Sequence, residues 1–181
     1  MNVQETTLPG VRLLMPTIHR DNRGAFWETW NEREAADLGL PTNWVQDNFS
    51  VSQRNVVRGI HYQLVQPQDK LLRVTHGVLL DVAVDLRRSS PAFAQHVAIK
   101  MTAENGEMLY IPRGFGHAFV ALTDVVGLAY KVTDFYSAAG DRTIVWDDPD
   151  LAIPWPVDAA NAILSDKDRN GARLCDAEVF A

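Results

Sequence analysis

The segment Val78-Leu79-Leu80-Asp81-Val82-Ala83-Val84-Asp85-Leu86 has the pattern that decides the fold class. Alternate positions form two sets of side chains, and such alternation with a period of two is typical of a β-strand. The sets are Leu80, Val82, Val84 and Leu86 on one side and Leu79, Asp81, Ala83 and Asp85 on the other. The next segment repeats the pattern at Val97, Ile99 and Met101. We therefore predict a β-strand in each of these two segments.

Turn signals recur at short intervals on both sides of this segment. They occur at Asp47-Asn48, Arg54-Asn55, Gln66-Pro67, His76-Gly77, Ser90-Pro91 and Asn105-Gly106. Many short strands joined by regular turns indicate a β-sandwich or a β-barrel. The aromatic-rich segment Ala25–Trp30 is also predicted to be a strand.

Helical signals are few. Asn31 followed by Glu32-Arg33-Glu34 resembles a helix N-cap with an acidic third position, and Gly39 supplies the stop. The last third of the chain, which contains Asp147-Asp148-Pro149 and Ile153-Pro154-Trp155-Pro156, is predicted to form loops and a short helix wrapped on the barrel. We predict an all-β fold with a few short peripheral helices.

The composition predicts one domain spanning residues 1–181. A chain of 181 residues with 46% hydrophobic residues can bury one substantial core. It has no basic N-terminal region followed by an apolar run and no stretch of 18 apolar residues, so we predict a soluble cytoplasmic protein with no membrane partner. The lone Cys175 excludes an internal disulfide.

The formal net charge is −6, which argues against a nucleic-acid surface. It does not argue against a small anionic ligand, because a few local Arg and Lys residues are enough to hold one. We therefore expect no nucleic-acid partner, and the local distribution of charge decides whether a small anion is bound.

The segment Arg58-Gly59-Ile60-His61-Tyr62-Gln63 is the first candidate site. In a regular strand His61 shares a face with Gly59 and Gln63, whereas Arg58 lies on the other face. A histidine here could be an ordinary surface or hydrogen-bonded core residue. It could also do chemistry, because imidazole titrates near neutral pH.

The segment Gly106–His117 resembles the second sequence motif of the cupin superfamily. The shared features are a glycine, a Pro112-x-Gly114 turn and a histidine at 117. The resemblance implies a cupin-type jelly-roll β-barrel. Metal-binding cupins supply a His-x-His pair from the first motif, but here His61-Tyr62-Gln63 offers one histidine, and Ala121 stands where asparagine is usual. We predict that no metal is bound, and that His61 and His117 serve as acid/base or hydrogen-bonding groups.

A wider set of motifs resembles the dTDP-4-dehydrorhamnose 3,5-epimerase family. In chain order they are Gln46–Ser50, Val57–Gln63, Lys70–Val74, Asp81–Arg87, Ile111–His117, Tyr130-Lys131 and Leu164–Asp168. Together they cover residues 10 to 170. The resemblance implies a homodimer of jelly-roll subunits without metal or other cofactor. It also implies inversion of configuration beside the 4-keto group of a dTDP-linked 6-deoxyhexulose.

Four residues match the chemistry that such an inversion needs. Removing a weakly acidic proton calls for a base with a pKa near the working pH, and His61 matches the family's base, oriented by Asp168. Lys70 matches the cation that stabilises the enolate. Tyr130 matches the acid that returns a proton to the opposite face. Each residue alone could instead be structural, as a surface lysine, a strand aromatic or a turn aspartate.

A further set matches the family's substrate-binding positions, some of them supplied by the partner subunit. Arginine forks and amides suit a diphosphate, and Tyr136 matches the position that stacks on thymine. Tyr130 and Tyr136 have the same strand parity, so we expect both to face the pocket. The predicted substrate contacts are Arg23, Phe26, Glu28, Gln46, Asp47, Asn48, Arg58, His117, Tyr136, Asp141 and Lys167.

Three alternatives remain open from the sequence. One is an epimerase that inverts only C3 or only C5 of another dTDP-deoxysugar, since Ala118, Ala138 and Asp141 differ from residues common in the family. Another is a non-catalytic cupin that binds a sugar nucleotide. The third is a metal-dependent cupin oxygenase or isomerase, which the single histidine of the first motif disfavours.

Overall fold

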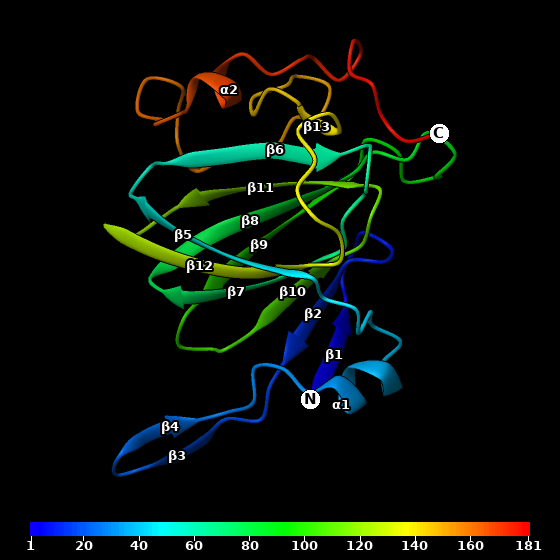
Figure 1. The fold of residues 1–181 in the computed structure, drawn as a ribbon. Helices are drawn as coiled ribbons and strands as arrows, with labels where there is room; N and C mark the ends of the chain where they lie inside the picture. The colour runs from blue at the N-terminus through cyan, green and yellow to red at the C-terminus, as the bar shows by residue number, and fades with distance from the viewer.

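Two antiparallel sheets face each other in the computed structural model, which describes residues 1–181 (Figure 1). The larger sheet has the order β1 (Asn2–Glu5), β2 (Arg12–Met15), β10 (Met108–Ile111), β7 (Lys70–His76), β12 (Val125–Val132) and β5 (Gln46–Gln53). The smaller sheet has the order β13 (Asp141–Thr143), β6 (Val57–Gln63), β11 (Phe115–Ala121), β8 (Val78–Asp85) and β9 (His96–Thr102). The predicted all-β jelly-roll architecture is confirmed.

Both alternating sets of side chains in β8 include buried apolar residues. Leu79 and Ala83 belong to the main core, which fills the space between the two sheets. Val82 and Val84 belong to a second core between the outer face of the smaller sheet and the C-terminal part of the chain. Both faces of the strand are therefore shielded from water, one by the main core and the other by the second core.

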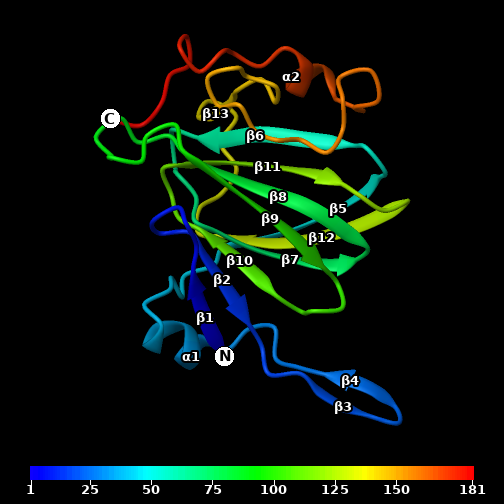
Figure 2. The same cartoon turned by 180° about the vertical axis from the view of Figure 1, so that it is seen from behind.

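The C-terminal third covers the smaller sheet as predicted, and Figures 1 and 2 show it passing over β6. It contains the short helix α2 (Asp166–Arg169), which begins after the N-cap residue Ser165. The predicted helix near residue 31 is α1 (Glu32–Asp37), and the side chain of Asn31 accepts hydrogen bonds from the backbone N–H groups of Arg33 and Glu34. No helix of the structure has the length and apolar character needed to cross a membrane.

The prediction of a strand over Ala25–Trp30 is wrong beyond its first two residues. The strand is β4 (Gly24–Phe26), which pairs only with β3 (His19–Asp21) in a hairpin that projects away from the barrel (Figures 1 and 2). Trp30 leaves the strand to pack edge-on against Trp44, with ring centroids 5.6 Å apart. Burial of this tryptophan against the larger sheet overrides the local strand propensity.

An irregularity in β6 changes which side chains share a face. His61 pairs with His117 of β11, but Arg58 pairs with Phe119, so three steps along β6 match two steps along β11. This bulge places Arg58 and His61 on the same face, and the prediction that they lie on opposite faces is wrong. Gly59 lies within the bulge at φ 112°, and a side chain there would collide with the backbone of His117 and Ala118.

Candidate active site

A cavity of about 280 Å³ opens between the two sheets and gathers residues that are far apart in the chain. Strands β6 and β11 supply one wall, and β7 and β12 supply the opposite one. The loop after β12, strand β13 and helix α2 border it. Eight of the predicted site residues line this cavity, namely Arg58, His61, Lys70, His117, Tyr130, Tyr136, Asp141 and Lys167.

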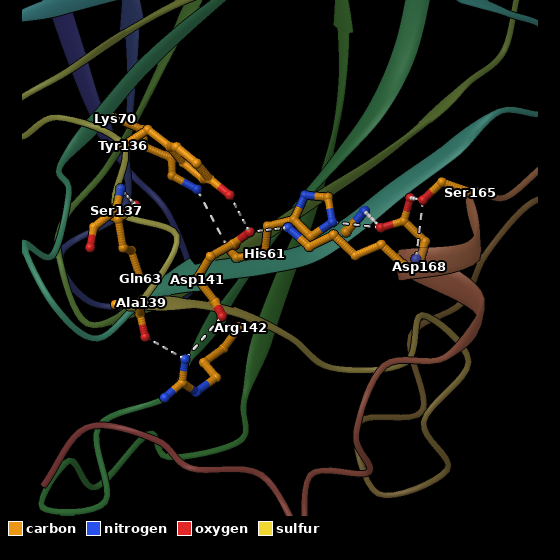
Figure 3. A network of polar contacts seen from close by, with 12 residues as sticks. His61, Gln63, Lys70, Tyr136, Ser137, Ala139, Asp141, Arg142, Ser165 and Asp168 are labelled. Atoms are coloured by element: carbon orange, nitrogen blue, oxygen red, sulfur yellow. Dashed lines mark hydrogen bonds and ion pairs between the residues drawn. The ribbon is translucent and has the colours of Figure 1, made fainter.

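His61 and Asp168 form a close pair at this cavity (Figure 3). The Nε2 atom of His61 lies 2.5 Å from Oδ1 of Asp168, which is 4% exposed. The same carboxylate accepts hydrogen bonds from the backbone N–H of Gly59 at 3.1 Å and from Oγ of Ser165 at 2.6 Å. Because a carboxylate only accepts, Nε2 carries the ring proton, and the lone pair of the neutral ring is on Nδ1.

The charge states of the pair follow from their surroundings. Burial lowers the pKa of His61, and this effect outweighs the opposing effect of the hydrogen bond that the ring donates to Asp168. For Asp168, burial acts to raise the pKa, but the hydrogen bonds from His61, Ser165 and Gly59 hold it below its usual value. At neutral pH the site thus holds a neutral imidazole next to a carboxylate, which is the form required of a general base.

Lys70 is buried at the start of β7, and its Nζ lies 3.4 Å from the backbone carbonyl oxygen of His61. Burial lowers the pKa of Lys70 to about 8, while the nearby carboxylates of Asp81 and Asp141 oppose this fall. A cation with a pKa close to neutrality is still charged at pH 7. It can also stabilise an anion strongly, because little water screens it.

Tyr130 lies on β12 of the larger sheet, whereas His61 lies on β6 of the smaller one. The two side chains therefore enter the cavity from opposite walls. Burial raises the pKa of Tyr130, and Arg58 opposes this rise. The phenol is protonated at neutral pH and can act as a proton donor.

Tyr136, Asp141 and Lys167 form a cluster at the edge of the cavity. One carboxylate oxygen of Asp141 accepts from Nζ of Lys167 at 2.5 Å and from the hydroxyl of Tyr136 at 3.2 Å. Tyr136 lies beyond the end of β12, so the strand-parity argument does not apply to it. It nevertheless lines the same cavity as Tyr130, because the loop after the strand turns back toward β6.

Six of the predicted substrate-binding residues do not line the cavity. Gln46 contacts a residue that lines the cavity, since its Oε1 accepts a hydrogen bond from the backbone N–H of Tyr136 at 3.2 Å. Asp47 and Asn48 line a second cavity of about 440 Å³, bordered by Trp30 and Arg73. The other three, Arg23, Phe26 and Glu28, lie in or just after the projecting hairpin, where Phe26 is 69% exposed.

Asp81 is a site residue that the sequence analysis did not single out for a role. It is completely buried, and its Oδ2 lies 3.0 Å from Nε2 of His117. The sequence feature that could have identified Asp81 is a carboxylate within the apolar run of β8, since a charged residue is rarely buried without a partner. Gln63 and Ser165 were also missed as residues that hold the site together.

The two histidines do not converge on a common centre with acidic ligands. His61 and His117 face each other across neighbouring strands, but each Nε2 contacts its own carboxylate, Asp168 or Asp81. No group of three or more His, Cys, Asp or Glu side chains is placed to hold a metal ion. The two pairs therefore have the geometry of separate hydrogen-bonded dyads.

Comparison with known proteins identifies the family to which these motifs belong. The family model described as dTDP-4-dehydrorhamnose 3,5-epimerase matches residues 5–176. The chain belongs to the dTDP-4-dehydrorhamnose 3,5-epimerase family. The resemblance found in the sequence motifs is thus confirmed, and with it the expectation of a cupin-type jelly roll.

Similarity to individual members of the epimerase family extends over nearly the whole chain. The dTDP-4-dehydrorhamnose 3,5-epimerase of Pseudomonas aeruginosa is 46% identical over 181 residues, covering 99% of each chain. The structure of a dTDP-6-deoxy-D-glucose-3,5-epimerase from Legionella pneumophila, in complex with dTDP-4-keto-L-rhamnose, superposes with a TM-score of 0.94 at 39% identity, covering 98% of this chain and 94% of that one.

The epimerase family also contains relatives whose names specify a single centre. A dTDP-4-dehydro-6-deoxyglucose 3-epimerase from a Streptomyces species is 38% identical over 165 residues, covering 90% of this chain and 84% of the relative. The 3,5-epimerases and this 3-epimerase are therefore both similar to the chain. The number of inverted carbons has to be measured.

Proposed function

We propose that this protein is an epimerase that inverts C3, C5 or both, beside the 4-keto group of a dTDP-4-keto-6-deoxyhexose. One observation carries the proposal. His61, which is hydrogen-bonded to Asp168, and the phenol of Tyr130 enter one cavity from opposite walls, and the buried Lys70 lies beside His61. Family membership supports the same reaction.

The first half of the reaction is proton removal. Nδ1 of His61 takes the proton from the carbon next to the ketone, and the C–H electron pair moves to form an enolate. Asp168 stabilises the resulting imidazolium through its hydrogen bond to Nε2. Lys70 stabilises the negative charge on the enolate oxygen, and it does so strongly because it is fixed and buried.

The second half is proton delivery to the opposite face. The hydroxyl of Tyr130 donates its proton to the carbon, a new C–H bond forms, and the phenolate then takes a proton from solvent. The imidazolium of His61 returns its proton to solvent. The product has the composition of the substrate and differs only in configuration, so the step needs no oxidant or reductant.

Substrate binding requires contacts for a diphosphate and for a base. Arg58 and Lys167 border the cavity and offer donors for phosphate oxygens, and His117 lies on the same cavity wall as Arg58. Tyr136 is 61% exposed at the cavity edge, where an aromatic ring is available for stacking on thymine. These assignments are those that the family resemblance predicted.

We further propose that the protein is a homodimer in which the β3–β4 hairpin of one subunit completes the cavity of the other. Arg23 lies in the turn of the hairpin and Phe26 at the end of β4, and neither lines the cavity of its own subunit, although both match substrate-binding positions. The exposed ring of Phe26 and the guanidinium of Arg23 could stack on and pair with a nucleotide bound to the partner subunit.

The cytoplasmic location expected from the sequence stays a prediction.

Proton NMR of dTDP-4-keto-6-deoxyglucose in D₂O with the protein tests the proposed function. We expect deuterium at C3, C5 or both, together with inversion at the exchanged centre. Exchange at one carbon only would identify a single-centre epimerase. Tight binding without exchange would replace the proposal with the non-catalytic alternative.

A further inference from the structure

The four residues Asp134–Ser137 follow β12 without forming a strand, and they include Tyr136. Their backbone is held by three glutamine side chains from other parts of the chain. Gln68 donates to the carbonyl oxygen of Asp134 at 2.8 Å, and Gln46 accepts from the N–H of Tyr136 at 3.2 Å. The remaining contacts come from Gln63.

Gln63 contacts both neighbours of Tyr136 in the chain, and Figure 3 shows its contact with Ser137. Its Nε2 donates to the carbonyl oxygen of Phe135 at 3.0 Å and to that of Gln66 at 2.6 Å. Its Oε1 accepts from the N–H of Ser137 at 2.9 Å. Two carbonyls can only accept and an N–H can only donate, so these partners require one orientation of the amide.

The side chain of Gln63 is committed to the fold. It is 6% exposed, and both amide hydrogens and the carbonyl oxygen are already used by backbone groups. Although it borders the cavity, it has no free donor for a ligand. Gln63 also pairs in register with Asp141, whose carboxylate accepts from the hydroxyl of Tyr136. The paired ends of β6 and β13 therefore contact the tyrosine at both ends, its backbone neighbours through Gln63 and its hydroxyl through Asp141.

We propose that Gln63 is a positioning residue for the nucleotide base, because it clamps the backbone on both sides of Tyr136 and so presents the ring for stacking. The inference rests on the proposed function in one respect, the role of Tyr136 toward thymine. The exposed tyrosine ring has little packing of its own to hold it. Its position therefore depends on the backbone contacts, and an ordered ring costs less entropy on binding.

The test uses Gln63→Met, which removes all three hydrogen bonds with little change of volume, and Gln95→Met as the matched control. Gln95 is exposed and lies outside the cavity lining. We expect Gln63→Met to raise KM for dTDP-4-keto-6-deoxyglucose and Kd for dTDP alone by about tenfold, with kcat changed less than about threefold. Gln95→Met should leave all three unchanged.

A second measurement does not depend on catalysis. Amide hydrogen exchange of the peptide covering 133–140 should become faster in Gln63→Met, because the N–H of Ser137 loses its acceptor. In a Tyr136→Ala background, Gln63→Met should add less than about a twofold change in Kd for dTDP, because its effect passes through the tyrosine.

The outcomes separate this inference from the proposed function. A purely structural role would lower Tm and kcat while leaving the Kd for dTDP unchanged, and that result would overturn the inference. Additive losses in the double variant, or unchanged exchange of the 133–140 peptide, would also overturn it. A wild-type protein that fails to bind dTDP would overturn the proposed function and the nucleotide role of Gln63 together.

Discussion

The Nε2 atom of His61 and the Oδ1 atom of Asp168 lie 2.5 Å apart, although 107 positions separate the two residues in the chain. Helix α2 packs against β6 and presents Asp168 from its buried side. The carboxylate is held by Ser165 and by the N–H of Gly59, so its orientation does not depend on the histidine alone. A fixed carboxylate of this kind selects the ring tautomer with Nδ1 free to accept a proton.

Asp168→Asn should keep the fold and lower kcat by about 10²- to 10⁴-fold, because an amide does not stabilise the imidazolium and can select the wrong ring tautomer. Turnover and solvent exchange at C3 and C5 would be measured, with Tm as the check of folding. Asp166→Asn is the matched control, since Asp166 is an exposed acid on the same helix. Wild-type exchange in folded Asp168→Asn would contradict the role of the pair.

Tyr130→Phe should separate exchange from inversion. A base on one wall can remove and return a proton without help, so deuterium should still enter next to the ketone. Inversion needs delivery from the other wall, and it should fall more than exchange does. NMR in D₂O reports both quantities in one sample. Equal losses of exchange and inversion would assign Tyr130 to the fold or to the enolate.

The pH dependence of kcat/KM should be bell-shaped. The rate rises as His61 loses its proton, and this limb should lie below the usual histidine value because burial lowers the pKa of His61. The rate falls as Lys70 loses its charge, near its pKa of about 8. Lys70→Arg should remove the basic limb, since arginine stays charged, even if the rate is lower. A basic limb that persists in Lys70→Arg would belong to another group.

Exhaustive chelation should leave the activity unchanged. The expectation rests on the donor set, because His61 and His117 each contact a separate carboxylate and no third ligand joins them. The measurement is turnover after dialysis against a chelator, with metal analysis of the same sample. Activity that is lost on chelation and restored by a divalent metal would favour a metal-dependent cupin instead.

Co-expression of Arg23→Ala and Tyr130→Phe subunits should restore activity if the hairpin serves the partner's cavity. In a mixed dimer, one cavity then combines an intact Tyr130 with an intact Arg23. With random pairing, about a quarter of the cavities in the sample would be complete. Light scattering would confirm the dimer. If the mixture is no more active than the average of the two single variants, the hairpin acts within its own subunit or not at all.

Local patterns in the sequence were enough to predict several of the strands and the first helix. The two-residue alternation of Val78–Leu86 corresponds to β8, and the N-cap at Asn31 begins α1. Such features depend on neighbouring residues, because strand pleat and helix capping act over only a few positions. The resemblance to the family motifs predicted the jelly roll, because these motifs combine many such local patterns in one order along the chain.

The errors occurred where a distant contact changed local geometry. A regular strand would separate Arg58 from His61, but a bulge against β11 brings them to one face. The strand expected over Ala25–Trp30 ends at Phe26, because Trp30 packs against Trp44 instead. Gly59 is a local sign of a bulge, but the side to which the strand turns is set by its pairing with β11, and the packing of the tryptophan leaves no sign in adjacent residues.

By itself, the sequence determined an all-β fold of short strands, and its resemblance to the family motifs named His61, Lys70, Tyr130 and Asp168 as candidate groups, because local periodicity and motif order are written in the chain. Only the tertiary structure decided that these groups meet. Their proximity depends on the register of β6, β7 and β12 and on the packing of α2, which are set by burial of the two cores over the whole chain. The pKa values of His61 and Lys70 follow from that burial, since desolvation is a property of the surroundings and not of the residue.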